Sequence, residues 1–210
     1  LDQSSIKNLI NGTGIVLHTG FGRAPISKKI IQRVATKLDG YINLEFDLLN
    51  GKRGYRQNHL SKMCNAIFGC QSSLLVNNNA SAVLLSLNSL AEGKEVIVSR
   101  GQEVEIGGSF RIPDIIQKSH AKLIEIGTTN RTHLADYEKA ISSSTGVILW
   151  AHTSNYVVKG FTKEVPLKDL ALLSKKKRVP LVVDLGSGTI ISTENYNLPK
   201  EKNIQEISKT

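Results

Sequence analysis

The chain has 210 residues, of which 40 % are apolar and 21 % charged, and its formal net charge is +9. This composition is typical of a globular protein, and it excludes a wholly disordered chain and, because the glycines have no period of three, a collagen. No stretch approaches the ~18 consecutive apolar residues of a membrane helix, and residues 1–5 show no secretory signal. The positive charge favours a polyanionic partner, with nucleic acid, a phosphorylated metabolite and an anionic membrane all open.

The first third of the chain predicts two helices separated by a loop. Residues 1–26 predict an irregular entry segment, because glycines interrupt its only apolar stretch. A helix follows Pro25 and Ser27, with one apolar stripe that ends at Leu38. Residues 39–57 carry too many charges for a buried element and predict an extended loop. The apolar spacing of residues 60–68 predicts a second helix, which ends at Gly69.

From residue 74 onward, short apolar strands alternate with helices. The strands are expected at 74–76, 95–98, 121–126, 146–150 and 180–185. The helices are expected at 80–91, between 107 and 119 with a disturbance at Pro113, at 134–141 with Thr132 as N-cap, and at 166–177 with Pro166 as first residue. Five strands joined by helices predict a mainly parallel sheet in a three-layer α/β fold. Residues 192–210 are polar and predict no sixth strand.

Polar residues follow three of these strands, at the edge where the carboxyl ends of parallel strands meet and ligands bind. After the first strand, Asn78, Asn79, Ala80 and Ser81 open a helix whose N-terminus suits a phosphate. The alternative is that Asn79 only caps the helix. After the fourth strand, residues 152–156 form a polar cluster that begins with His152, and a structural role for this histidine is the alternative.

Asp184 and Ser187 follow the fifth strand. A carboxylate at this position is at least half buried and requires a cationic partner, which could be a metal, an arginine or a protonated ring nitrogen. The alternative is a capping Asp at a tight turn.

Two basic features are candidate anion sites. Lys52, Arg53 and Arg56 lie on a glycine-flanked loop, for which a solvated loop is the alternative, and Arg23 precedes a helix start. The basic run at 175–178 closes a helix, where cations complement the dipole. The sequence contains no glycine-rich nucleotide-binding motif. The histidines and cysteines lack the spacing of metal ligands, so no metal site is expected. Two cysteines fit no disulfide framework, so a reducing cytoplasm is the expected compartment.

The order of phosphate loop, polar cluster and Asp resembles the large domain of fold-type-I pyridoxal 5'-phosphate (PLP) enzymes. The short sequence motifs are similar to those of the bacterial selenocysteine synthase family, over about residues 10–190. The matching motifs are Asn11-Gly12-Thr13-Gly14, Leu17-His18-Thr19, Gly22-Arg23-Ala24-Pro25, Gly51-Lys52-Arg53-Gly54, Val76-Asn77-Asn78-Asn79-Ala80, Val98-Ser99-Arg100-Gly101, the block 105–114, the block 127–133, His152-Thr153-Ser154-Asn155-Tyr156 and Asp184-Leu185-Gly186-Ser187-Gly188.

The resemblance implies conversion of L-seryl-tRNA(Sec) to L-selenocysteinyl-tRNA(Sec) with selenophosphate, through a PLP-bound aminoacrylyl intermediate. It assigns Arg23, and less closely Arg53, to the phosphorylated selenium donor. The implied cofactor-binding residues are Asn78, Asn79, Ala80, Ser81, Gln102, His152, Asp184 and Ser187, with Asp184 at the pyridine nitrogen and Gln102 or Glu103 stacked on the ring. The family assembles as a cytoplasmic ring of dimers with active sites at subunit interfaces, without a membrane partner. Arg56 and Asp136 match its inter-subunit ion pair.

Two departures from the family pattern define what this stretch is expected to be. The Ser-Gly-Asp-Lys-type motif with the Schiff-base lysine does not occur in residues 1–210, and neither does the N-terminal tRNA-binding domain. Residues 1–26 are therefore expected to be a connecting segment. Residues 27–210 are expected to be the first five strands of the PLP-binding large domain, incomplete at the C-terminus, inactive and poorly stable alone.

Two other functions remain open. One is a lyase of the same family that acts on a small amino acid or an amino sugar acid and ignores tRNA. The other is a non-catalytic basic module that binds RNA, which accounts for the missing lysine but leaves Asp184 and residues 77–79 unexplained.

Overall fold

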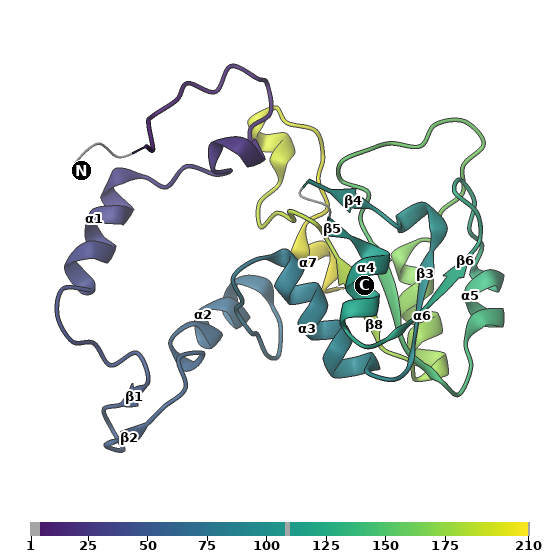
Figure 1. Cartoon of the computed structure of the whole chain (residues 1–210), viewed down its shortest axis with the longest axis horizontal. Helices are drawn as coiled ribbons and strands as arrows, with labels where there is room; N and C mark the ends of the chain where they lie inside the picture. Colours follow the sequence, from purple (N-terminus) through teal and green to yellow (C-terminus); the bar gives the residue numbers. More distant parts are fainter. Residues whose placement is uncertain (1–4, 108–109, 210) are drawn as a thin grey trace. The chain divides into compact units, whose positions relative to one another are not determined.

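The computed structural model of the protein describes residues 5–107 and 110–209, so Gly108 and Ser109 of the family block 105–114 lie outside the described residues (Figure 1). The chain divides into two compact units, Leu1–Tyr55 and Arg56–Thr210. The functional boundary expected between residues 26 and 27 stays a prediction.

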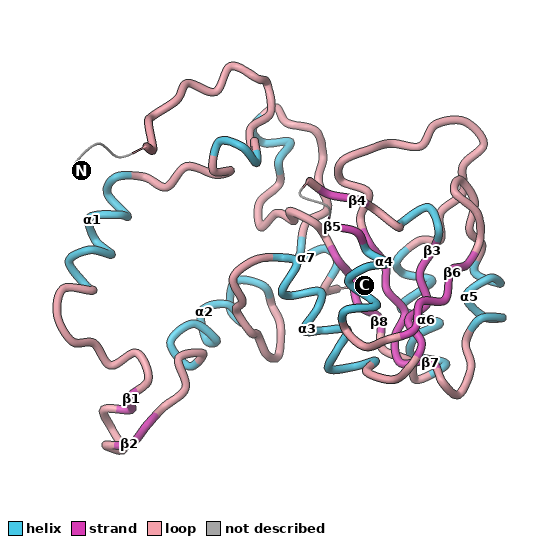
Figure 2. Tube along the Cα trace, viewed as in Figure 1, coloured by secondary structure: helices cyan, strands magenta, loops and turns pink. Residues whose placement is uncertain are grey.

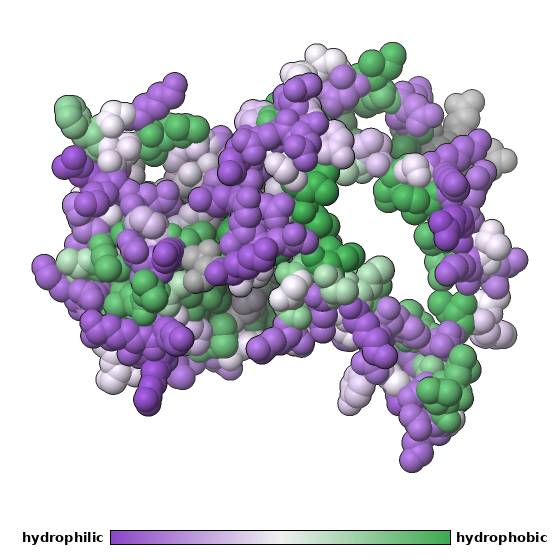
Figure 3. All heavy atoms as spheres, turned by 180° about the vertical axis from the view of Figure 1, so that it is seen from behind, coloured by the Kyte–Doolittle hydropathy of each residue, from purple (hydrophilic) through white to green (hydrophobic). Residues whose placement is uncertain are grey.

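The first unit contains the expected helix and a hairpin that the sequence did not predict. A short 3-10 helix, η1 (Thr19–Phe21), precedes α1 (Lys28–Lys37), and Ser27 Oγ caps α1 by accepting a hydrogen bond from the Ile30 N–H. Strands β1 (Phe46–Asp47) and β2 (Lys52–Arg53) pair antiparallel inside the expected loop. Their charges do not oppose strand formation, because both strands are largely exposed to water. Exposed apolar side chains are also frequent in this unit (Figure 3).

The second unit is built on a four-stranded parallel sheet with the order β6-β3-β7-β8 (Figure 2). The strands are β3 (Glu95–Ser99), β6 (Lys122–Ile126), β7 (Thr145–Ala151) and β8 (Leu181–Asp184). Four helices connect or precede them: α3 (Asn79–Ala91), α4 (Ile112–Lys118), α5 (Leu134–Ala140) and α6 (Leu167–Lys177). The mainly parallel α/β architecture predicted from the sequence is confirmed.

Alternating side chains on the central strands create two cores, one on each face of the sheet. Val96 and Val98 of β3 lie in one cluster with α3 and α4, whereas Ile97 lies in the other with α5 and α6. Successive residues of a strand point to opposite faces, so a strand buried on both faces is apolar at every position. The second unit therefore has the three layers that the sequence predicted.

The first predicted strand, at 74–76, is wrong. These residues form no strand, and Leu74 and Leu75 are 58 % and 59 % exposed. A strand is stabilised by hydrogen bonds to a neighbouring strand, and this segment pairs with no strand among the described residues. The sheet consequently has four of the five predicted strands. Helix α2 (Asn58–Phe68), which precedes the segment, is present as expected and ends at Gly69.

Several predicted element boundaries are also corrected. Thr132 is not the N-cap of α5; it is buried, its hydroxyl lies 2.6 Å from that of Ser99, and His133 takes the cap position. Pro166 immediately precedes α6 rather than opening it. Pro113 lies in the first turn of α4, where a missing N–H costs no helical hydrogen bond.

The remaining elements are short. Strands β4 (Glu105–Ile106) and β5 (Phe110–Arg111) form a second unpredicted hairpin. The 3-10 helix η2 (Arg100–Gln102) follows β3, and η3 (Thr193–Tyr196) and α7 (Ile204–Ile207) follow β8. Within the described ranges, no helix has the length and apolar character needed to cross a membrane.

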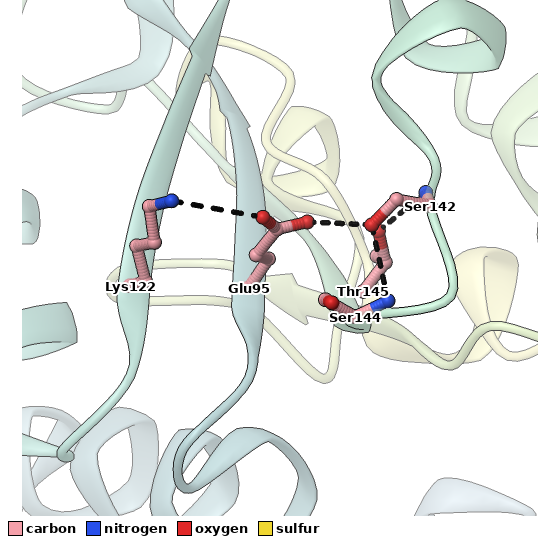
Figure 4. Close-up of polar contacts among 5 residues, drawn as sticks. All are labelled: Glu95, Lys122, Ser142, Ser144 and Thr145. Atoms are coloured by element: carbon pink, nitrogen blue, oxygen red, sulfur yellow. Dashed lines mark hydrogen bonds and ion pairs between the residues drawn. The ribbon is translucent and has the colours of Figure 1, made fainter.

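A polar network joins the amino-terminal ends of three strands (Figure 4). Glu95, the first residue of β3, lies 3.9 Å from Lys122 Nζ of β6 and accepts a 2.8 Å hydrogen bond from the Ser142 hydroxyl. The Ser142 N–H donates to Thr145 Oγ1 at the start of β7, and its hydroxyl accepts from the Ser144 N–H. This network fixes the edge of the sheet opposite to the carboxyl ends of the strands.

A second charged cluster lies at the carboxyl ends of β3 and β6. The pKa of Glu103 is raised to about 7, mainly by burial. A hydrogen bond with Glu125 and the negative charge of Glu125 also raise this pKa, whereas the positive charge of Arg100 lowers it. Glu103 Oε1 is buried without a hydrogen-bond partner, and an Arg100 Nη lies 3.7 Å from the Glu125 carboxylate. The surroundings of Glu103 therefore favour its protonated form more than water does.

The core contact of α3 gives a first prediction. Leu87 is 0 % exposed and Leu85, two residues away on the same helix, is 40 % exposed. We expect Leu87→Ala to lower the free energy of unfolding by about 2–5 kcal/mol, because it leaves a cavity between α3 and the sheet. Leu85→Ala is the matched control and should cost about 1 kcal/mol or less. Urea denaturation measures both, and equal losses would contradict the assignment of Leu87 to the core.

The Glu103–Glu125 pair gives a second prediction. The pKa of Glu103 is higher in the folded than in the unfolded protein, so the folded state binds this proton more tightly and stability falls as pH rises from about 4.5 to about 7. Glu103→Gln mimics the protonated form. It should stabilise the protein at pH ~8, by on the order of 1 kcal/mol because the carboxyl is partly solvated, and have no effect below pH ~4. Denaturation at both pH values checks this, and a pH-independent difference would refute it.

Candidate functional site

The N-terminus of α3 and the carboxyl end of β8 meet in one place. Asn78 caps α3, since its side-chain oxygen accepts a 2.9 Å hydrogen bond from the Ser81 N–H. Asn79 does not cap the helix; its side-chain amide donates a 2.9 Å hydrogen bond to Asp184 Oδ1, 105 residues away in the sequence. The structure thus brings together the loop predicted to hold a phosphate and the predicted Asp.

Asp184 is buried, with 5 % of its surface exposed. Its Oδ1 also accepts a 2.8 Å hydrogen bond from the Gly186 N–H, and it forms no ion pair with any described residue. Of the three cationic partners that the sequence allows, an arginine is therefore not found among the described residues, and two neutral N–H donors bond Oδ1. A metal or a protonated ring nitrogen stays a prediction. A carboxylate held in this way stays ready to accept a further N–H from a ligand.

Close packing of two loops surrounds Asp184. Gly186 has a φ of +66°, and a Cβ built there would lie 2.9 Å from Ser154 Oγ. The turn after β8 and the loop after β7 therefore approach each other closely, and only glycine fits without a shift. This packing holds the backbone on both sides of the carboxylate.

His152 lies beside Asp184 at the end of β7. Its backbone N–H donates a 2.8 Å hydrogen bond to the Asp184 carbonyl, which extends the pairing of β7 with β8. Its imidazole lies parallel to the Trp150 indole, with ring centroids 5.9 Å apart and planes 6° apart. The side chain is 21 % exposed, so part of the ring stays accessible at this edge of the sheet.

A cavity of about 310 Å³ opens at the carboxyl ends of the strands, and Gln102 and His152 are among its lining residues. The Gln102 amide is already engaged, because it donates to Glu164 Oε1 at 2.9 Å and its oxygen accepts from the Ala151 N–H at 3.4 Å. Gln102 is 3 % exposed. Its contact with a cofactor stays a prediction, and its observed role is to hold β7 against the loop before α6.

The other predicted site residues are more dispersed. Ala80 is in the first turn of α3, and Ser187 is exposed in the turn after β8. Arg23 and Arg53 belong to the first unit, where Arg23 is exposed with a φ of +64° and an Arg53 Nη lies 2.7 Å from Glu45 Oε2. Their role with the second unit stays a prediction. Asp136 accepts a hydrogen bond from the His133 N–H, and its pairing with Arg56 of another subunit also stays a prediction.

Two members of the polar cluster after β7 brace a neighbouring loop. The Asn155 amide donates to the Glu105 carbonyl, and the Tyr156 hydroxyl donates to the Gly101 carbonyl at 2.6 Å. Burial raises the pKa of Tyr156, with further contributions from Glu103 and Glu164. The sequence did not predict Glu164 or Glu201 near the site, and no motif marks either residue.

The sequence model of the family described as L-seryl-tRNA selenium transferase matches residues 9–210. The chain is 50 % identical over 204 residues to the L-seryl-tRNA(Sec) selenium transferase of Clostridium perfringens, which covers 97 % of this chain and 44 % of that protein. It is 50 % identical over 201 residues to the transferase of the same name from Carboxydothermus hydrogenoformans, covering 96 % of this chain and 43 % of that protein.

Among solved structures, D-glucosaminate-6-phosphate ammonia-lyase has a TM-score of 0.63 at 16 % identity, covering 79 % of this chain and 45 % of that chain. This likeness shows the fold alone. The chain spans a little less than half the length of the curated relatives that it matches. Because the family model covers almost all of its residues, the chain belongs to the L-seryl-tRNA selenium transferase family.

Proposed function

We propose that the full-length gene product converts L-seryl-tRNA(Sec) to L-selenocysteinyl-tRNA(Sec), with PLP as cofactor and selenophosphate as selenium donor. The observation that carries this proposal is the Asn79–Asp184 hydrogen bond, which places a helix N-terminus beside a buried carboxylate. The 50 % identity to curated selenium transferases supports the choice of reaction.

The residues at this edge fit PLP. The unpaired N–H groups and positive dipole end of α3 suit its phosphate, and Asn78, Asn79, Ala80 and Ser81 lie there. The Asp184 carboxylate suits the protonated pyridine nitrogen. When bound, PLP supplies an electron sink for negative charge that develops at the substrate α-carbon.

The chain's own residues would keep that sink effective. Asn79 and Gly186 orient the Asp184 carboxylate, which would hold a proton on the pyridine nitrogen. The His152 imidazole borders the same site with its plane set by Trp150, and it suits the face of an aromatic ring. Gln102 and Ser187 complete the proposed cofactor-binding set.

The arginines of the first unit are proposed to bind the selenium donor. A guanidinium pairs with a phosphoryl group through two parallel hydrogen bonds. Arg23 is the stronger candidate, because it forms no ion pair with the described residues, whereas Arg53 is paired with Glu45. The net charge of +9 suits a tRNA partner. We also propose a cytoplasmic ring of dimers with active sites at subunit interfaces.

The alternative function from the sequence is a lyase of the same family that acts on a small amino acid or an amino sugar acid. One solved structure with a similar fold over 79 % of this chain is D-glucosaminate-6-phosphate ammonia-lyase, a likeness of fold alone. Incubation of the full-length protein with seryl-tRNA(Sec) and with an amino sugar acid separates the two. Loss of the seryl hydroxyl supports the transferase, whereas release of ammonia only from the sugar acid overturns it.

The cofactor is tested by trapping. The full-length protein is loaded with PLP and reduced with borohydride, and the labelled peptide is mapped by mass spectrometry. We expect one labelled lysine outside residues 1–210. A label on a lysine within these residues would contradict the proposed topology of the site. No label would overturn PLP chemistry, and RNA affinity that falls steeply with salt would then favour the RNA-binding module.

The role of Asp184 gives a further prediction. We expect Asp184→Asn to lower kcat by about 100-fold or more, because the amide cannot hold the proton on the pyridine nitrogen. Asp169→Asn, an exposed position in the first turn of α6, is the matched control and should leave kcat unchanged. Steady-state turnover of seryl-tRNA(Sec) measures both. A variant at 184 with near-normal kcat would rule out this role.

A further inference from the structure

A segment that follows η3 returns to the carboxyl edge of the sheet. Residues 199–203, the returning segment, are held through Asn203, which forms a parallel bridge with Thr189 and donates a 3.0 Å hydrogen bond from its amide to the Ile190 carbonyl. Thr193 fixes the other end, since its hydroxyl donates to the Pro199 carbonyl and accepts from the Glu201 N–H. The segment is therefore attached to the loop after β8 at both ends.

Two charged side chains of the returning segment contact the stacked rings at the end of β7. Glu201 Oε2 lies 3.5 Å from His152 Nε2, and Lys202 Nζ lies 5.0 Å from the centroid of the Trp150 ring. Asp184 also contacts His152, but through the backbone: its carbonyl accepts a hydrogen bond from the His152 N–H. A carboxylate and an ammonium thus each face one of two parallel rings.

The Glu201 contact restricts a torsion that is otherwise loose. Rotation of an imidazole about its last bond is broad, and stacking on Trp150 alone permits sliding and flipping of the ring. When Nε2 carries a proton, its attraction to the Glu201 carboxylate favours one orientation of the ring, with Nδ1 turned away from the returning segment. The lower exposure of the His152 side chain, 21 % against 48 % for Glu201, reduces the competition from water on its side of the pair.

We propose that Glu201 is a positioning residue that fixes the His152 imidazole against the cofactor ring. This inference rests on the proposed function, because it takes His152 to contact PLP. It extends that function to a residue 49 positions beyond His152 that is not among the proposed cofactor-binding residues. Glu201 would act on cofactor affinity and on the histidine, without direct contact with substrate.

The test compares Glu201→Gln with Glu194→Gln in the full-length protein. Glu194 is an exposed glutamate of η3 whose carboxylate accepts a hydrogen bond from the Ser192 hydroxyl, so it is a matched control. The readouts are the PLP dissociation constant from absorbance titration and the ring ¹⁵N shifts of His152 in the cofactor-free protein. We expect Glu201→Gln to raise the dissociation constant about five-fold and to move the His152 shifts, with neither change in Glu194→Gln.

A double-variant cycle shows whether Glu201 acts through His152. We expect the His152→Gln protein to bind PLP with the same affinity with or without Glu201→Gln. A further five-fold loss in the double variant would overturn the inference, as would wild-type affinity and wild-type ring shifts in Glu201→Gln. Absence of PLP binding by the wild-type protein would instead overturn the proposed function, and this inference with it.

Discussion

The burial of one carboxylate constrains the arrangement of the second unit. Asp184 ends β8 with almost no solvent exposure, and a buried carboxylate without hydrogen bonds would be strongly destabilising. Asn79 and Gly186 supply those bonds, one from the start of α3 and one from the next turn of the chain. The position of α3 relative to the sheet is thus tied to the same carboxylate that the proposed chemistry requires, so one contact links the stability of the fold to the proposed function.

The direction of the strands explains why the proposed chemistry gathers on one edge. In β3, β6, β7 and β8 all carboxyl ends point the same way, so each following loop begins on the same side. The opposite edge carries the polar network of Glu95, which joins the starts of three strands. One edge therefore holds the sheet together, and the other is free to present polar side chains to a ligand.

Local patterns predicted most of this fold, and long-range contacts account for the failures. The helix at 60–68 and the apolar strand at 95–98 follow from spacing alone. Residues 74–76 are as apolar as the other strands, but they lack a paired neighbour, and spacing cannot report that. The alternative that Asn79 caps α3 is wrong, because Asn78 caps the helix and Asn79 bonds to Asp184 instead. Spacing cannot report this contact, since its partners lie 105 residues apart in the sequence. Glu201 reaches His152 through folding of a polar segment that has no motif.

The motifs that identify the family serve packing as well as chemistry. A Cβ at Gly101 would lie 2.7 Å from the Thr129 carbonyl, and one at Gly127 would overlap the Thr132 hydroxyl. Both glycines lie in motifs that match the family, yet neither these glycines nor the threonines that they approach are proposed to touch a cofactor. Gln102 is likewise engaged by Glu164. The loops at this edge are thus held rigid by residues within the motifs, so a match to them is evidence for the shape of the site before it is evidence for the reaction. The proposed reaction would depend on the fewer side chains, above all Asp184, that these loops leave available to a ligand.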